Sequence, residues 1–209
     1  MNFKHFSRLL LVVLTLLISS APRTLFAQHA VDPATLNPPP PPQFNPVCKS
    51  VGAGTICTVQ FSEAPFAGGS GIICGTGAGT YEVFQTQNRS VEGHRYYDQN
   101  GDLTRRLFHE VDTGTYSNPI SHVSVSFSAR LTTLHDLSIP GDINSGTQAI
   151  TGPWRVFLPR GGVVVIEVGR LILSGDGNVV FSESGPHPFL AYFALGDTAA
   201  LQPLCDALR

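Results

Sequence analysis

Basic and aromatic side chains gather around one candidate hairpin and could bind a small anion. Arg95 and Tyr97 precede the turn at residues 98–102, and Arg105 and His109 follow it. If residues 98 and 102 face each other, residues of equal parity share one face of the hairpin, and all four side chains lie together. Cations turned toward a core need counter-charges, water or a ligand. We therefore expect Arg95, Arg105, His109 and Tyr97 to bind a small apolar or carboxylate ligand, unless a β-bulge turns the arginines to solvent.

The same residues do not form a recognisable catalytic site. His109 and Glu110 are sequence neighbours, and neighbours on a strand point to opposite faces, so they cannot act on one side of a substrate. The sequence contains no nucleophile elbow, no phosphate-binding glycine loop leading into a helix and no common zinc spacing. We expect no metal and no cofactor. An isomerase that uses His109 as acid or base is kept as an alternative.

Short runs of β-forming residues must position the hairpin. The run 123–132 alternates apolar and polar residues at every position, as a strand with one buried face does. Further strands are expected at 56–62, 81–87, 91–97, 103–113, 147–151, 154–158, 163–168, 171–173 and 179–183. About ten strands with short turns predict an all-β fold, an antiparallel β-barrel of about eight to ten strands, with a β-sandwich as the alternative.

The composition agrees with one β-rich domain. The chain has 209 residues, of which 13% are charged, with 21 Gly and 16 Pro. So few charges and so many turn formers exclude a coiled coil and a charge-rich disordered chain. Loss of residues 1–27, which hold Lys4, Arg8 and Arg23 and no acid, would change the formal net charge from −2 to −5. An acidic chain of this kind is not expected to bind nucleic acid.

The N-terminal residues have the order of a secretory signal peptide. Lys4 and Arg8 precede an apolar run at 9–18, which is too short to span a bilayer as a helix. We expect cleavage after Ala27, a secreted protein and no integral membrane segment afterwards. Residues 28–47 hold five consecutive prolines and are expected to form a disordered arm, and residues 48–209 a single barrel domain.

Four cysteines form an even set, and an exported chain meets an oxidising compartment, so two disulfides are expected. Three pairings are open. Spacing favours Cys48–Cys57 and Cys74–Cys205, and free thiols remain the alternative. Near the second bond, residues 197–208 carry apolar side chains at helical spacing, which Pro203 divides into two short turns.

Several short motifs carry a family resemblance. Ile73-Cys74-Gly75, the turn at 97–103, the Gly-Asp-Gly-Asn hairpin at 175–178 and the terminal segment 204–208 resemble those of uncharacterised exported bacterial β-rich proteins. The resemblance covers residues 72–209 and implies the Cys74–Cys205 bond. The architecture is more distantly similar to calycin and allene oxide cyclase-like barrels, from which no catalytic residue carries over.

These patterns together predict a secreted, disulfide-linked β-barrel protein that binds a small molecule in its interior. A structural or surface-interaction module is the second interpretation. The sequence leaves the oligomeric state and the identity of a ligand open.

Overall fold

The computed structural model describes residues 29–209, so the predicted signal peptide lies outside the described residues. The described chain forms one eleven-stranded antiparallel sheet with short helical segments. The strands are β1 (Val47–Val51), β2 (Gly54–Ser62), β3 (Phe66–Cys74), β4 (Tyr81–Tyr97), β5 (Leu103–Ser117), β6 (Ser124–Asp136), β7 (Thr147–Thr151), β8 (Trp154–Phe157), β9 (Val163–Glu167), β10 (Arg170–Ser174) and β11 (Val180–Ser184). The helical segments are η1 (Pro33–Thr35), η2 (Pro42–Phe44), η3 (Gly77–Gly79), α2 (Pro188–Leu195), η4 (Thr198–Leu201) and α3 (Gln202–Ala207).

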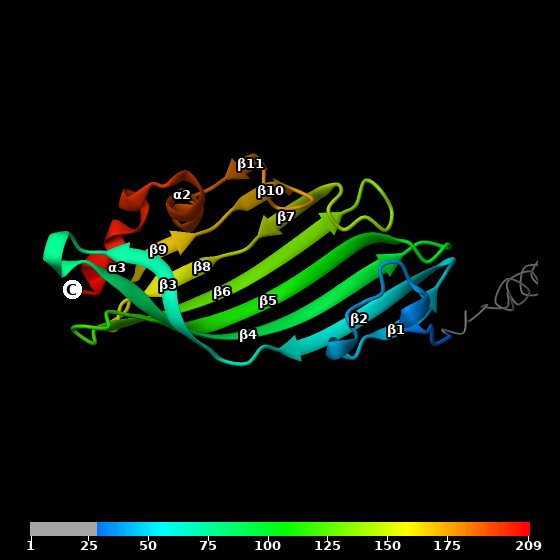
Figure 1. The fold of residues 1–209 in the computed structure, drawn as a ribbon, viewed down its shortest axis with the longest axis horizontal. Helices are drawn as coiled ribbons and strands as arrows, with labels where there is room; N and C mark the ends of the chain where they lie inside the picture. Colours follow the sequence, from blue (N-terminus) through cyan, green and yellow to red (C-terminus); the bar gives the residue numbers. More distant parts are fainter. Residues whose placement is uncertain (1–28) are drawn as a thin grey trace, which may run out of the picture.

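Three long strands, β4, β5 and β6, run side by side along the length of the molecule (Figure 1). At one end of the long strands the sheet has the order β1-β2-β4-β5-β6-β7-β10-β11. At the other end β3 pairs with β4, β8 pairs with β6, and β9 pairs with β8. Within residues 29–209, no strand pairing closes this sheet on itself. The predicted antiparallel β architecture is confirmed. The predicted closed barrel is not confirmed, because the pairing of these strands leaves the sheet open.

Alternating burial along β6 separates the two faces of the sheet. Val125, Phe127 and Ala129 are buried, and the residues between them are exposed or half-buried. This is the period-two pattern that the sequence predicts for the strand. We call the face that carries these buried residues the inner face. Val83 of β4 and Tyr116 of β5 are buried in the same cluster.

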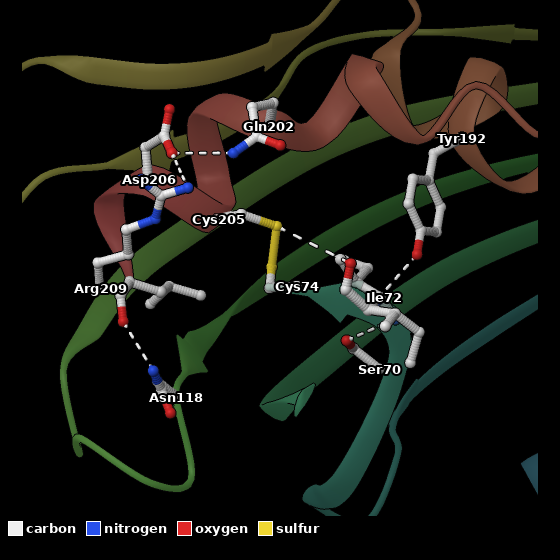
Figure 2. Close-up of a disulfide and its surroundings, with 11 residues drawn as sticks. Ser70, Ile72, Cys74, Asn118, Tyr192, Gln202, Cys205, Asp206 and Arg209 are labelled. Carbon is white, nitrogen blue, oxygen red and sulfur yellow. Dashed lines mark hydrogen bonds and ion pairs between the residues drawn. A yellow bond between two sulfur atoms is a disulfide. The ribbon is translucent and has the colours of Figure 1, made fainter. Parts of the chain in front are cut away.

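The C-terminal segment covers one end of the inner face. Leu201, Leu204 and Leu208 are fully buried in the cluster that also contains residues of β3, β8 and β9. Cys205 in α3 is bonded to Cys74 at the end of β3 (Figure 2). The favoured pairing is therefore confirmed, as is the division of the tail into two short turns.

Hydrogen bonds hold the same helical segment to the sheet. Asn118 Nδ2 donates to the carbonyl of Leu208 over 3.0 Å, and the backbone N–H of Ile73 donates to Tyr192 Oη over 2.7 Å (Figure 2). Tyr192 lies in α2, which the sequence analysis did not predict. These bonds link the chain's last helices to β3 and to the turn after β5, so the segment acts as a cover for this end of the sheet.

The segment predicted to be a disordered arm, residues 28–47, packs against the sheet over 29–46. Leu36 and Pro40 are buried, and Tyr97 Oη donates to the carbonyl of Pro38 over 3.0 Å. Asn37 exchanges backbone hydrogen bonds with the β4–β5 turn. The expectation of disorder is wrong because the proline carbonyls and rings find donors and apolar partners on the inner face. Beside the arm, the Cys48–Cys57 disulfide joins β1 to β2, as predicted.

A single bulged residue decides which side chains of β5 reach the inner face. Tyr97 pairs with Leu103, as the predicted turn requires, but Tyr96 then pairs with Arg105, which leaves Thr104 as an extra residue. A bulge of this kind reverses the faces of all later positions relative to the partner strand. Even-numbered residues of β5 beyond residue 105 therefore share the inner face with odd-numbered residues of β4.

His135 shows one consequence of this register. Its side chain is fully buried at the end of β6. Its Nδ1 accepts a hydrogen bond from Arg106 Nε over 3.2 Å, and its Nε2 donates to the carbonyl of Ser145 over 2.8 Å. Burial, and to a smaller degree the charge of Arg106, lower the pKa of His135. The neutral imidazole therefore anchors the loop between β6 and β7.

We expect this histidine to make stability depend on pH. The unfolded chain binds a proton near pH 6.5 and the folded chain does so only at lower pH, so stability is complete above pH 6.5 and falls below it. Between these two pKa values the free energy of unfolding should fall by up to about 1.4 kcal/mol per pH unit. His135→Gln should remove this slope in urea titrations at pH 5.5 and 8, while His109→Gln should keep it. An unchanged slope in His135→Gln would contradict the assignment.

Candidate ligand-binding pocket

A pocket of about 310 Å³ lies between α2 and the inner face of the sheet. Its apolar wall comes from strands β3, β6, β7 and β10 and from α2. The principal apolar side chains are Ile72, Leu131, Ile150, Leu171, Phe189 and Phe193. Ligand pockets in proteins are concave, mostly apolar and equipped with a few polar groups. The pocket has this general character, and its size is at the lower end of the usual range of about 300–1,000 Å³.

Aromatic side chains form one end of the pocket. The ring centroids of Trp154 and Phe189 lie 5.6 Å apart, and those of Tyr116 and Phe189 lie 6.3 Å apart. Phe127 packs behind them, with its centroid 5.2 Å from Trp154 and 4.8 Å from Tyr116. Burial raises the pKa of Tyr116 well above its ordinary value of 10, so its hydroxyl remains protonated. The aromatic end is therefore closely packed and uncharged.

Glu167 is the acidic residue of the pocket wall. It lies at the end of β9, opposite Trp154 in the strand pairing. Its Oε2 accepts a hydrogen bond from the backbone N–H of Phe189 over 2.8 Å, so the carboxyl group caps the first turn of α2. Burial raises the pKa of Glu167, and the hydrogen bond from Phe189 lowers it by a smaller amount. The acid is thus held in place by the helix that covers the pocket.

His187 directly precedes α2 and faces Glu167. Its Nδ1 lies 3.8 Å from Glu167 Oε1, and the side chain is only 8% exposed. Its Nε2 lies 3.1 Å from the carbonyl oxygen of Ser184. Because a carbonyl oxygen only accepts, Nε2 must carry the proton in this contact, and the neutral ring offers a lone pair at Nδ1. This nitrogen is buried and has no hydrogen-bond partner among the described residues.

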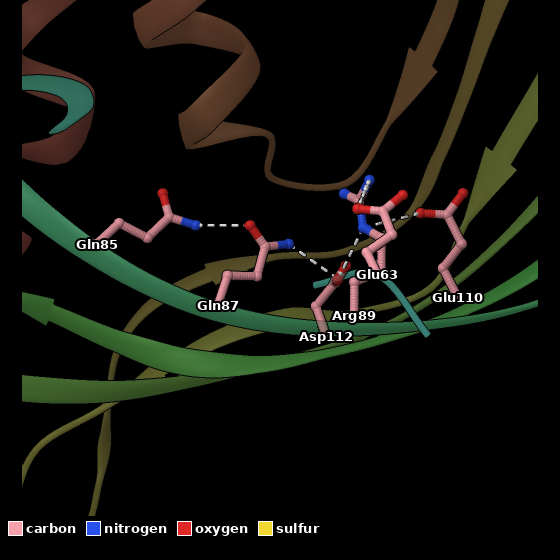
Figure 3. A network of polar contacts seen from close by, with 6 residues as sticks. All are labelled: Glu63, Gln85, Gln87, Arg89, Glu110 and Asp112. Carbon is pink, nitrogen blue, oxygen red and sulfur yellow. Dashed lines mark hydrogen bonds and ion pairs between the residues drawn. The ribbon is translucent and has the colours of Figure 1, made fainter. Parts of the chain in front are cut away.

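A polar network on β4 and β5 continues from the edge of the pocket along the inner face (Figure 3). Gln85, which lines the pocket, donates to Gln87, and Gln87 donates to Asp112 Oδ1, each over 2.9 Å. Arg89 Nε donates to the same Oδ1 over 2.9 Å. Asp112 is fully buried, and its Oδ2 has no partner among the described residues.

Two further carboxylates approach Arg89 at longer range. Its guanidinium lies 3.8 Å from Glu110 and 3.9 Å from Glu63. Burial is the main cause of the raised pKa of Glu110, and the charge of Arg89 opposes it. Three acids therefore surround one arginine, and the network carries an excess of negative charge when all of them are ionised.

The structure brings together only two of the four predicted site residues, Arg95 and Tyr97. Arg95 and Tyr97 lie on the inner face at the far end of the sheet, where Arg95 Nη1 donates to the carbonyl of Pro39 over 3.4 Å. Arg105 pairs with Asp136, and His109 contacts Thr132, on the exposed outer face. The predicted register was wrong because of the Thr104 bulge. None of the four lines the pocket beneath α2, and His109 has neither arginine beside it to hold a carboxylate.

The residues that do line the pocket were missed. Glu167 and Trp154 come from two strands, and His187 from the residue before α2, all distant from the hairpin in sequence. One local signal was present: Pro188 at the first helical position and Gly196 just after the last are the usual start and stop of a helix. Nothing local indicates that this helix packs over Trp154.

The fold and the pocket define an open-sheet antiparallel β protein with two disulfides and an apolar cavity under a short helix. Comparison of the chain with family models, with curated proteins and with solved structures gave no match. In the part of the chain that the structure describes, no three His, Cys, Asp or Glu side chains are grouped so that they could hold a metal ion. No helix of residues 29–209 is both long and apolar enough to cross a bilayer.

Proposed function

We propose that this chain is an exported protein that binds a small, largely apolar molecule in the pocket beneath α2. The observation that carries the proposal is the largely apolar cavity of about 310 Å³ beneath α2. A ligand bound there would bury its apolar surface away from water, which is favourable. Export is supported by the pattern of residues 1–27 and by two disulfides, which are typical of oxidising compartments.

The pocket wall favours an apolar ligand over a carboxylate. The cations predicted to hold a carboxylate, Arg95 and Arg105, lie elsewhere, and the side chains that line the pocket include no arginine or lysine. A carboxylate would instead approach Glu167. An enzymatic role based on His109 loses its support, because that side chain contacts Thr132 on the exposed outer face, away from the pocket.

Trp154 provides a direct test, since it lines the pocket and is the single tryptophan of the sequence. Titration of the mature protein with n-octanol should give a saturable change in tryptophan fluorescence. Ile150→Phe, which places a larger side chain in the pocket, should weaken binding by at least about tenfold, equivalent to about 1.4 kcal/mol. Val111→Phe, at an exposed position on the outer face, should bind as the wild type does.

The two variants separate pocket binding from surface adsorption. A fluorescence change that does not saturate, or equal weakening in both variants, would exclude the pocket as the site. Native mass spectrometry of protein secreted by its own leader should also show a co-purified small molecule that Ile150→Phe no longer retains.

A further inference from the structure

The acidic side chain at the pocket is a hydrogen-bond acceptor. Glu167 lines the cavity, and its Oε2 is already occupied by the N–H of Phe189, which leaves Oε1 for a further donor. His187 also lines the cavity, but its Nδ1 is buried without accessible surface. A ligand that satisfies Glu167 must donate a hydrogen bond. A carboxylate ion, which has no donor, cannot do so.

The charges around the cavity have the same sign. Among residues 29–209, Glu167 is the one acidic lining residue, and no lysine or arginine lines the cavity. Nearby on the inner face, Asp112, Glu110 and Glu63 surround Arg89, and Asp112 keeps a buried oxygen without a partner among these residues. Asp112 is opposite Ala129, which in turn is opposite Trp154, so this carboxylate lies two strands from the aromatic end of the pocket. The local field therefore favours a cation.

The aromatic end of the pocket suits a cation as well. Trp154, Tyr116 and Phe189 present ring surfaces to one cavity. The face of an aromatic ring attracts an ammonium group, most strongly for tryptophan and when water is excluded. The indole N–H of Trp154 has no hydrogen-bond partner among the described residues and essentially no accessible surface, so it does not act on a ligand in the cavity.

We propose that the ligand class of this pocket is a small hydrophobic primary amine, with its ammonium group at Glu167 and its hydrocarbon part along Leu131, Ile150 and Leu171. This inference rests on the proposed function, because it names the head group of a ligand for the same cavity. An ammonium ion can donate a hydrogen bond to Glu167 Oε1 and also balance the charge of the carboxylate. An alcohol can donate the hydrogen bond but carries no charge.

Three probes of equal chain length test the head group: octylamine, n-octanol and octanoate, each titrated at pH 8 with Trp154 fluorescence as the readout. We expect octylamine to bind at least about tenfold more tightly than n-octanol, and octanoate to bind more weakly than either. Glu167→Gln keeps a carbonyl oxygen for the N–H of Phe189 but removes the charge. It should reduce the preference for octylamine over n-octanol to less than about threefold.

Glu92→Gln is the matched control, because it makes the same change at an exposed position on the outer face, and it should keep the wild-type preference. Binding of n-octanol as tightly as octylamine to the wild type would overturn the amine proposal and leave the proposed function standing. Full retention of the amine preference in Glu167→Gln would also overturn it. If none of the three probes binds, both proposals fail.

Discussion

Replacing Cys74 and Cys205 by serine is expected to lower the free energy of unfolding by about 5 kcal/mol, because the bond closes a long loop. The two cysteines are 131 positions apart, so the bond restricts most of the unfolded chain. It also fixes α3 over the apolar cluster that contains Leu204 and Leu208. Urea unfolding of the double variant under non-reducing conditions, followed by circular dichroism, measures the loss.

The second disulfide provides the matched comparison. Cys48 and Cys57 are nine positions apart and join two neighbouring strands, so their replacement by serine should cost about 3 kcal/mol. Hydrogen exchange should distinguish the two variants further, with new exposure at the C-terminal helices in the first and at β1 and the proline arm in the second. Equal losses of stability would show that loop length does not determine the contribution of these bonds.

Asp112→Ala is expected to cost about 2–4 kcal/mol, the range for loss of one partner from a buried charged hydrogen bond. Asp112 is fully buried and accepts hydrogen bonds from Gln87 and Arg89. Its removal leaves the guanidinium with the two more distant carboxylates of Glu110 and Glu63. The expected loss is at the lower end of that range, because the Arg89 side chain is 34% exposed and water can hydrate it.

Glu92→Ala is the control for this variant. The Glu92 carboxylate is 55% exposed and contacts His94 on the outer face, so its loss should change stability by less than about 0.5 kcal/mol. Equilibrium unfolding in urea at pH 7.5 compares the two variants with the wild type. An effect of Asp112→Ala no larger than that of Glu92→Ala would show that the buried network contributes no net stability.

The hairpin between β4 and β5 shows how far the local sequence could predict the fold. The turn at residues 98–102 forms as expected, with Gly101 at a positive φ of 82° that glycine adopts without strain. The residue that follows Leu103 then bulges, and the predicted faces of Arg105 and His109 are reversed. The sequence of a strand contains no reliable signal for a one-residue bulge, because its cause is the packing of the finished sheet.

The pocket shows the other limit of sequence reasoning. Glu167 and His187 are twenty positions apart and meet only because α2 folds back over β9. In the sequence, His187 is one of seven histidines, and it lies between two prolines without an acidic residue next to it. Nothing in its residue type sets it apart. The contact with Glu167 and the cavity beside it depend on the placement of a helix, which long-range burial determines.

The sequence by itself determined the β-rich architecture, the positions of most strands and the two turns with glycine at a positive φ. Each of these follows from short-range chemistry or from the period-two alternation of apolar side chains. It favoured the observed cysteine pairing but left all three pairings open. Tertiary structure alone decided that the sheet stays open, that the proline segment packs against it and that an acid and an imidazole meet beside an apolar cavity. These outcomes depend on which surfaces exclude water together, and such surfaces come from segments far apart in the chain.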